Sequence, residues 1–231
     1  WHSISAFCNA GFDLFGYQSE YNSLVNYVAD PVINITIMLL IIVGGLGFIV
    51  WDDLTIKKFK FKKYTLQTKI VLVTSFVLIF GGALLFYIFE KDNVLANATI
   101  SEKIFGSLFS SVTARTAGFN TLDVASFKDS TKLLTCVLMF IGGSPGSTAG
   151  GVKTVTIMVI VVYLWSSLRS SKSCNIFSRS ISDADVKKAS NIIVIHMGMA
   201  VVACMALCYF NDIALGDIML EIFSAIGTVG M

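Results

Sequence analysis

The chain has 231 residues, of which 55% are hydrophobic and 14% charged, and its mean hydropathy is +0.77. Soluble globular domains carry about 25% charged residues, so this composition excludes an ordinary soluble domain and indicates a polytopic membrane protein. The net charge is only +2, and we expect no nucleic-acid partner.

The positive charges are concentrated in two segments. Eleven of the 17 lysines and arginines lie there: Lys57, Lys58, Lys60, Lys62, Lys63 and Lys69 in the first, and Arg169, Lys172, Arg179, Lys187 and Lys188 in the second. Cytoplasmic loops are enriched in Lys and Arg, so both segments are predicted to be cytoplasmic. The first could also form a patch for anionic lipids, although orientation alone accounts for its lysines.

Residues 1–51 are predicted to contain a short helix, a polar glycine loop and a membrane-spanning helix from Pro31 to about Trp51. Proline suits the first turn of a helix, and about 20 apolar residues are enough to cross a bilayer. Gly44, Gly45 and Gly47 lie near the end of this helix. They indicate either close helix packing or a hinge.

Four further units follow in the predicted order. They are a basic loop at 52–69, a unit at 70–165, a second basic loop at 166–185 and a final unit at 186–231. The spans are expected at Ile70–Phe89, Ser130–Trp165 and Val186–Tyr209, and the short amphipathic helices at Ile100–Val112 and Asp217–Ile226.

A short glycine loop occurs three times, after each of the three short helices. The copies are SAFCNAGFD, SSVTARTAGFNT and SAIGTVGM, in which Gly11, Gly118 and Gly230 fall in register. Glycine permits backbone conformations that other residues disfavour, and irregular backbone within a bilayer has to line a cavity or be buried in protein. Three copies predict one pore lined by equivalent loops, which open on the outer face.

Ser130–Trp165 is too long for one span and is interrupted by GGSPGSTAGGVKT. Glycine and proline both destabilise a helix interior, so we expect two helical pieces joined by a loop at 142–154. The loop either lines the ion path or is a packing kink. Lys153 either extends to the membrane interface or occupies a cation position within the pore.

Arg115 lies inside the second glycine loop, where a buried charge is costly unless it is paired or functional. One interpretation is that it braces the loop from behind by bonding carbonyls or a carboxylate. The other is that it faces the pore, where a guanidinium would repel cations.

Two enzyme motifs nearly match the interrupting loop. Gly142–Gly146 resembles the nucleophile elbow of serine hydrolases, but Pro145 lacks the N–H that the oxyanion hole requires. Gly146–Thr154 approaches a phosphate-binding loop, but Val152 separates the glycine from the lysine. We therefore expect no enzyme, with an intramembrane serine hydrolase acting through Ser144 kept as an alternative.

Together the motifs CNAGFD, TARTAGFN, GTVGM and GGSPGSTAGG resemble the Trk/Ktr/HKT superfamily of potassium transporters, and most closely its KtrB-type subunit. The resemblance covers the whole chain. It implies an all-α polytopic fold with four helix–pore loop–helix repeats around one pore. Compared with that pattern, the chain lacks the first repeat, the first helix of the second and the last helix of the fourth. We therefore expect a part of a longer protein, unable to conduct alone.

The resemblance also implies the residues of the site. Potassium would bind backbone carbonyls of Asn9, Ala10, Gly11, Thr116, Ala117, Gly118, Thr228, Val229 and Gly230. The gate would be the intramembrane loop formed by Gly142, Gly143, Ser144, Pro145, Gly146, Ser147, Thr148, Ala149, Gly150, Gly151 and Lys153. Potassium would be the pore ion, sodium a candidate activator, and no organic cofactor is expected.

The expected setting is the bacterial plasma membrane, with a homodimer seated on a cytoplasmic nucleotide-binding ring of the KtrA type. Two alternatives to the KtrB-type interpretation stay open besides the hydrolase. One is a Trk-type subunit of the same superfamily, and the other is a non-conducting membrane scaffold.

Overall fold

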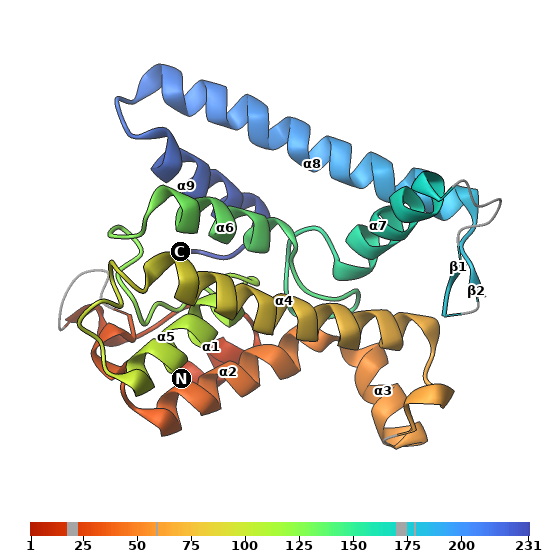
Figure 1. The fold of residues 1–231 in the computed structure, drawn as a ribbon, viewed down its shortest axis with the longest axis horizontal. Helices are drawn as coiled ribbons and strands as arrows, with labels where there is room; N and C mark the ends of the chain where they lie inside the picture. The colour runs from red at the N-terminus through yellow and green to blue at the C-terminus, as the bar shows by residue number, and fades with distance from the viewer. Residues whose placement is uncertain (18–22, 59, 170–174, 178) are drawn as a thin grey trace.

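The computed structural model describes residues 1–17, 23–58, 60–169, 175–177 and 179–231, and these residues are mostly helical (Figure 1). Lys172, part of the second basic segment, lies outside these residues. Three short helices are α1 (His2–Phe7), α5 (Ile100–Thr113) and α9 (Leu215–Gly227), and each ends where a glycine loop begins.

The longer helices are α2 (Pro31–Leu46), α4 (Leu66–Glu90) and α8 (Asp183–Phe210). Each short helix packs against one of them: α1 on α2, α5 on α4 and α9 on α8. Among the described residues, α4 and α8 are each long and apolar enough to cross a membrane. Two of the three glycine loops therefore follow short helices that pack on helices of membrane-spanning length.

Local sequence explains where two of these helices begin. Asp30 caps α2, because its Oδ1 accepts hydrogen bonds from the backbone N–H groups of Val32 (2.8 Å) and Ile33 (3.1 Å), and Pro31 fills the first turn. Thr99 and Glu102 form a reciprocal capping box at the start of α5. These caps satisfy N–H groups that the helices themselves leave free.

The expected single helix from Pro31 to Trp51 is wrong. The chain bends by 94° at Gly47, between α2 and α3 (Phe48–Lys57). Gly47 has φ +89°, a conformation that favours glycine. The hydropathy pattern runs through this point without interruption, so the glycine cluster is the sequence signal that marks the break.

The stretch Ser130–Trp165 is interrupted as expected, into α6 (Asp129–Phe140) and α7 (Thr154–Leu168). Both segments predicted as basic loops contain regular secondary structure. Within 52–69, α3 continues to Lys57, a short 3₁₀ helix η3 covers Phe61–Lys63, and α4 begins at Leu66. Within 166–185 the chain forms a small antiparallel hairpin, β1 (Asn175–Ile176) and β2 (Arg179–Ser180), before α8 begins at Asp183.

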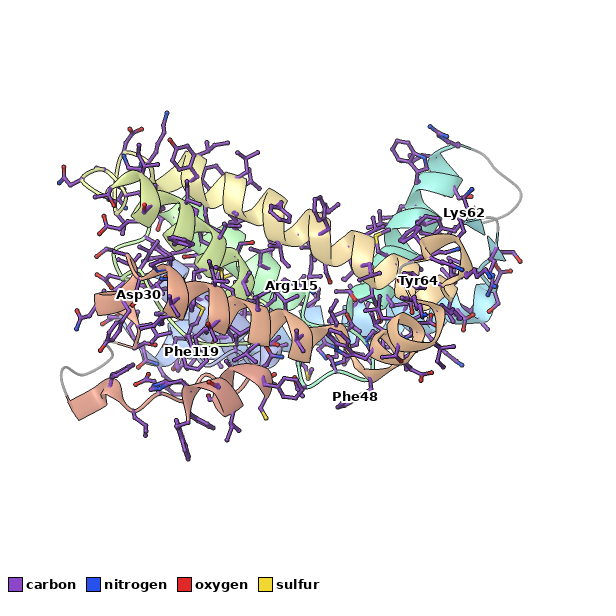
Figure 2. All side chains as sticks on the ribbon, turned by 90° about the horizontal axis from the view of Figure 1, so that it is seen from below. Asp30, Phe48, Lys62, Tyr64, Arg115 and Phe119 are labelled. Carbon is purple, nitrogen blue, oxygen red and sulfur yellow. The ribbon has the colours of Figure 1, made fainter. Side chains whose placement is uncertain are left out.

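The two basic segments lie at the same end of the molecule. Figure 1 shows α3 and the β1–β2 hairpin together at one end of the long axis, whereas the C-terminal residue, which follows the third glycine loop, lies in the other half. In Figure 2, Asp30 and Lys62 lie at opposite ends with Arg115 between them. The remaining 3₁₀ helices, η1 (Phe15–Tyr17) and η2 (Val25–Tyr27), lie between α1 and α2 in the chain.

Apolar side chains fill the space behind the glycine loops. Ala6, Ile41, Phe109 and Phe119 belong to one buried cluster that joins α1, α2 and α5. A second cluster, which includes Met139, Leu220 and Val229, joins α6, α9 and the third loop. Tight packing behind the loops restricts their backbone to one conformation.

Candidate functional site

The three glycine loops share one backbone pattern. In each, the register glycine has a positive φ, and so does the residue two positions before it, while the residue between them does not. The φ values are 50° and 69° at Asn9 and Gly11, 81° and 87° at Thr116 and Gly118, and 55° and 79° at Thr228 and Gly230. Alternating the sign of φ turns successive carbonyl groups toward the same side of the chain.

The three loops also meet in space, although they lie far apart in the sequence. A Cβ atom built on Gly11 would lie 2.5 Å from the carbonyl oxygen of Ala117, and one built on Gly118 would lie 2.3 Å from that of Val229. Such distances are too short for a real side chain. Glycine is thus required at both positions for its φ and for the close approach of the neighbouring loop.

The nine carbonyl oxygens of these triplets accept no hydrogen bond from any described residue. Buried carbonyls normally have a partner, and Ala117 and Val229 are almost fully buried, at 0% and 1% exposed. The triplets are Asn9–Gly11, Thr116–Gly118 and Thr228–Gly230. Their carbonyl oxygens form a cluster of hydrogen-bond acceptors for which the described residues supply no donor.

Each loop is fixed to the last turn of its own short helix. The backbone N–H groups of Ala10, Ala117 and Val229 donate to the carbonyls of Ser5 (2.9 Å), Thr113 (2.9 Å) and Ser224 (2.8 Å). In the third loop the Ser224 hydroxyl also accepts from the N–H groups of Gly230 and Met231, both at 3.0 Å. The loops therefore begin at helix C-termini, whose partial negative charge favours a cation nearby.

Arg115 lies behind the second loop and between α2 and α4 (Figure 2). Its guanidinium donates to the Ser75 hydroxyl of α4 (3.3 Å), and its Nε atom is buried without a partner. Of the described residues, none offers it a carboxylate, so the expected carbonyl or carboxylate partner is replaced by a hydroxyl. Arg115 also lines a small cavity of about 10 Å³ with Ser75, Gly45 and Gly143, which is about the space of one water molecule.

The loop between α6 and α7 closes on itself at its base. Ile141 and Val152 form a parallel β-bridge, and the N–H of Gly142 donates to the carbonyl of Val152 (3.0 Å). Gly142 and Gly150 allow this close approach, since a Cβ atom on Gly142 would lie 2.0 Å from the Gly150 carbonyl oxygen. The loop is an ordered structure and not a simple kink in a continuous helix.

This loop contacts two of the glycine loops directly. The Thr148 hydroxyl donates to the Phe7 carbonyl (3.0 Å) and accepts from the Asn9 amide (2.8 Å), at the first loop. A Cβ atom on Gly150 would lie 1.8 Å from the Thr228 hydroxyl oxygen, at the third loop. The structure therefore brings the predicted gate residues together with the predicted ion-binding residues.

The same loop is hydrogen-bonded to the break between α2 and α3. The N–H of Ser144 donates to the carbonyl of Gly45 (3.1 Å), and the N–H of Phe48 donates to that of Gly146 (3.0 Å). Sequence reasoning missed this connection. The only signal was the cluster of glycines, for which packing and a hinge were both considered.

Lys153 turns back into the loop. Its ammonium donates to the carbonyl of Ala149 (2.6 Å), and the side chain is partly buried. A positive charge is therefore held against the C-terminal half of the loop.

Ser144 has none of the neighbours that a hydrolytic serine needs. It is fully buried, and its Oγ atom lies 3.5 Å from the hydroxyl of Thr154. Serine hydrolysis requires a general base within hydrogen-bond reach, and no described histidine or carboxylate is bonded to Ser144. In the described part of the chain, no group of three or more His, Cys, Asp or Glu residues is arranged to hold a metal ion.

Helices of membrane-spanning length, three converging loops of unused carbonyls and an ordered loop packed against them indicate a polytopic membrane transport protein. The model of the TrkH family, described as a cation transport protein, matches residues 1–231. The chain therefore belongs to the TrkH family of cation transport proteins, which is a transporter family and not a class of enzymes.

Named relatives agree with this family. Over its full length the chain is 39% identical to the Ktr system potassium uptake protein B of Bacillus subtilis and 37% identical to the potassium/sodium uptake protein NtpJ of Enterococcus hirae. It spans about half of each relative, 51% in both cases.

The fold also matches a solved structure. The crystal structure of the potassium transporter TrkH from Vibrio parahaemolyticus aligns with a TM-score of 0.72 and 15% sequence identity, over 99% of this chain and 55% of that one. At this identity the match establishes the fold alone, which is that of a polytopic membrane transporter.

Proposed function

We propose that the full-length protein conducts potassium across the plasma membrane through a filter built from the nine carbonyls of the three glycine triplets. The observation that carries this proposal is the shared φ pattern in three loops that meet. A dehydrated cation needs several oxygen ligands, which backbone carbonyls supply in potassium-selective filters. The names of the relatives from Bacillus subtilis and Enterococcus hirae support potassium as the ion.

A fourth set of carbonyls belongs to this proposal. Gly11 faces the second loop and Gly118 faces the third, whereas a Cβ atom on Gly230 would meet no described atom within 4 Å. The free side of Gly230 is where a further loop of the longer protein would complete the ring. Sodium enters as a second candidate, either carried as the name of the Enterococcus relative suggests or acting as an activator.

The loop between α6 and α7 is the proposed gate. It is bonded to Asn9 of the first triplet and packed against Thr228 of the third, so it lies directly beside the filter. Lys153 holds a positive charge against this loop, where it would oppose a passing cation. Opening would require the contacts of Thr148 and Gly150 to be released.

The orientation and the partners follow from the charge distribution. With the lysine-rich end of the molecule in the cytoplasm, the three filter loops face the outside. The KtrB-type interpretation is favoured over the Trk type by the 39% identity to a Ktr uptake protein across the whole chain. It implies a homodimer on a cytoplasmic nucleotide-binding ring of the KtrA type, with both basic segments available for docking.

Gly118→Ser tests the filter. The new side chain would overlap the Val229 carbonyl, a proposed ligand, and would strain a backbone with φ +87°. In liposomes that hold the full-length protein, we expect potassium-over-sodium selectivity to fall at least about tenfold, or roughly 1.4 kcal/mol. Sodium is varied in the same assay.

Gly81→Ser in α4 is the matched control, since a Cβ atom there would meet nothing within 4 Å. It should leave selectivity unchanged. Flux that is indifferent to Gly118, or no flux from the wild type, would overturn the filter assignment and favour a non-conducting scaffold.

A further inference from the structure

A groove of about 410 Å³ lies between α4, α7 and α8, at the end of the molecule that carries the basic segments. Its volume is within the range of small-molecule sites, roughly 300–1,000 Å³. The walls are mainly apolar, with Leu66 and Ile70 from α4, Val155 and Val159 from α7, and Ile192 from α8. Such a groove can bury a hydrocarbon chain.

The rim of the same groove is polar and carries one charge of each sign. Asp185 and Lys188, from the first turns of α8, both line it, and neither takes part in an ion pair with a described residue. The Nε2 atom of Gln67 is buried there without a hydrogen-bond partner among the described residues. This atom has almost no exposed surface, so the charged groups that a ligand in the groove can reach are the exposed ends of Asp185 and Lys188.

We propose that the groove binds one phospholipid with a zwitterionic head that carries a primary ammonium, as in phosphatidylethanolamine. An acyl chain lies along Ile70, Val159 and Ile192. The phosphate accepts hydrogen bonds from the Lys188 ammonium, and the lipid ammonium donates to the Asp185 carboxylate.

The charges discriminate between lipid heads. A purely anionic head would be placed against the Asp185 carboxylate, which is unfavourable. A choline head matches the net charge but has no N–H to donate to that carboxylate. Phosphatidylethanolamine alone among these three satisfies both rim charges.

The test uses the purified full-length protein and native mass spectrometry with phosphatidylethanolamine, phosphatidylcholine or phosphatidylglycerol added separately. We expect the wild type to retain phosphatidylethanolamine at least about fivefold better than the other two. Asp185→Asn should abolish this preference, and Lys188→Gln should lower retention of all three lipids. Thr156→Trp, which fills the groove, should lower retention without changing a charge.

Asp183→Asn and Lys187→Gln are matched controls, because these residues are exposed on the same turns but do not line the groove. They should bind lipid as the wild type does. Equal retention of the three lipids, or equal effects of the control variants, would overturn the proposal. So would groove variants that change the oligomeric state and leave lipid retention unchanged, since the occupant would then be a second copy of the chain.

Discussion

Thr116 and Thr228 are β-branched residues with positive φ, at 81° and 55°. This conformation is rare for such residues and costs about 1–3 kcal/mol at each position. Both threonines lie at the same place in a glycine triplet, beside the carbonyls that have no partner. The surrounding packing keeps both residues in this strained conformation. Because the strain recurs at the same position in two loops, we infer that the function needs this loop shape in spite of its cost in stability.

Thr148→Val tests the single-residue contact between gate and filter. Thr148 makes two hydrogen bonds to the first loop region, to Asn9 and Phe7, and each hydrogen bond contributes about 0.5–1.5 kcal/mol. Their loss should loosen the gate loop and raise basal potassium flux in liposomes roughly tenfold, with selectivity preserved.

Thr148→Ser is the control for this prediction, because serine keeps the hydroxyl and both hydrogen bonds. Its flux should match that of the wild type. A Thr148→Val protein whose basal flux is unchanged or reduced would show that these contacts do not hold the pore closed.

At the scale of elements, the break between α2 and α3 ties the proposed gate loop to the end of the molecule that carries the basic segments. The loop is bonded to Gly45 and Phe48 on either side of Gly47. The next helix is then held in place by Asp53, which accepts from Lys57 (2.5 Å), from the Thr65 N–H (2.8 Å) and from Thr68 of α4 (2.7 Å). A displacement of α3 would therefore be transmitted to the loop through backbone bonds.

Gly47→Ala should disturb this connection. Residues other than glycine strongly disfavour φ +89° with ψ 150°, and the new Cβ atom would lie 2.7 Å from the Pro145 carbonyl oxygen. We expect the full-length protein to lose about 1–3 kcal/mol of stability and to show altered basal flux, measured by thermal unfolding and liposome assays.

Gly45→Ala is the matched substitution two residues earlier. A Cβ atom there would meet its nearest neighbour, the Asn9 amide, at 3.8 Å, which is ordinary contact. Its behaviour should be close to the wild type. If the two variants behaved alike, the bend at Gly47 would have no special role in the gate.

The elements differ in how far the sequence could predict them. The interruption between α6 and α7 was predictable, because Pro145 and several glycines lie within a few residues of one another. The bend at Gly47 was only one of two interpretations of the glycine cluster, because the apolar pattern continues through it and the Phe48 N–H donates to Gly146, far away in the chain. Arg115 was recognised as buried, but its partner Ser75 belongs to a different helix and has no signature in the sequence.

At the scale of the whole molecule, the register of Gly11, Gly118 and Gly230 was readable from the repeat. That the loops line one pore was also predicted, but which loop lies against which was not, since it depends on how α2, α4 and α8 bring the loops together. In the folded chain the three loops are neighbours, with Gly11 against Ala117 and Gly118 against Val229. They should therefore behave as one site and not as three.

A double-mutant cycle with Gly11→Ser and Gly118→Ser measures whether the first and second loops act as one site. Either substitution would displace carbonyls of the same cluster, so the second should add little to the loss of potassium selectivity caused by the first. We expect an interaction energy of about 0.5–3 kcal/mol, as for residues in contact. Gly118→Ser combined with Gly81→Ser is the reference pair and should be additive. Additive losses for Gly11 and Gly118 would mean that the loops bind ions independently, and the single filter would then have to be abandoned.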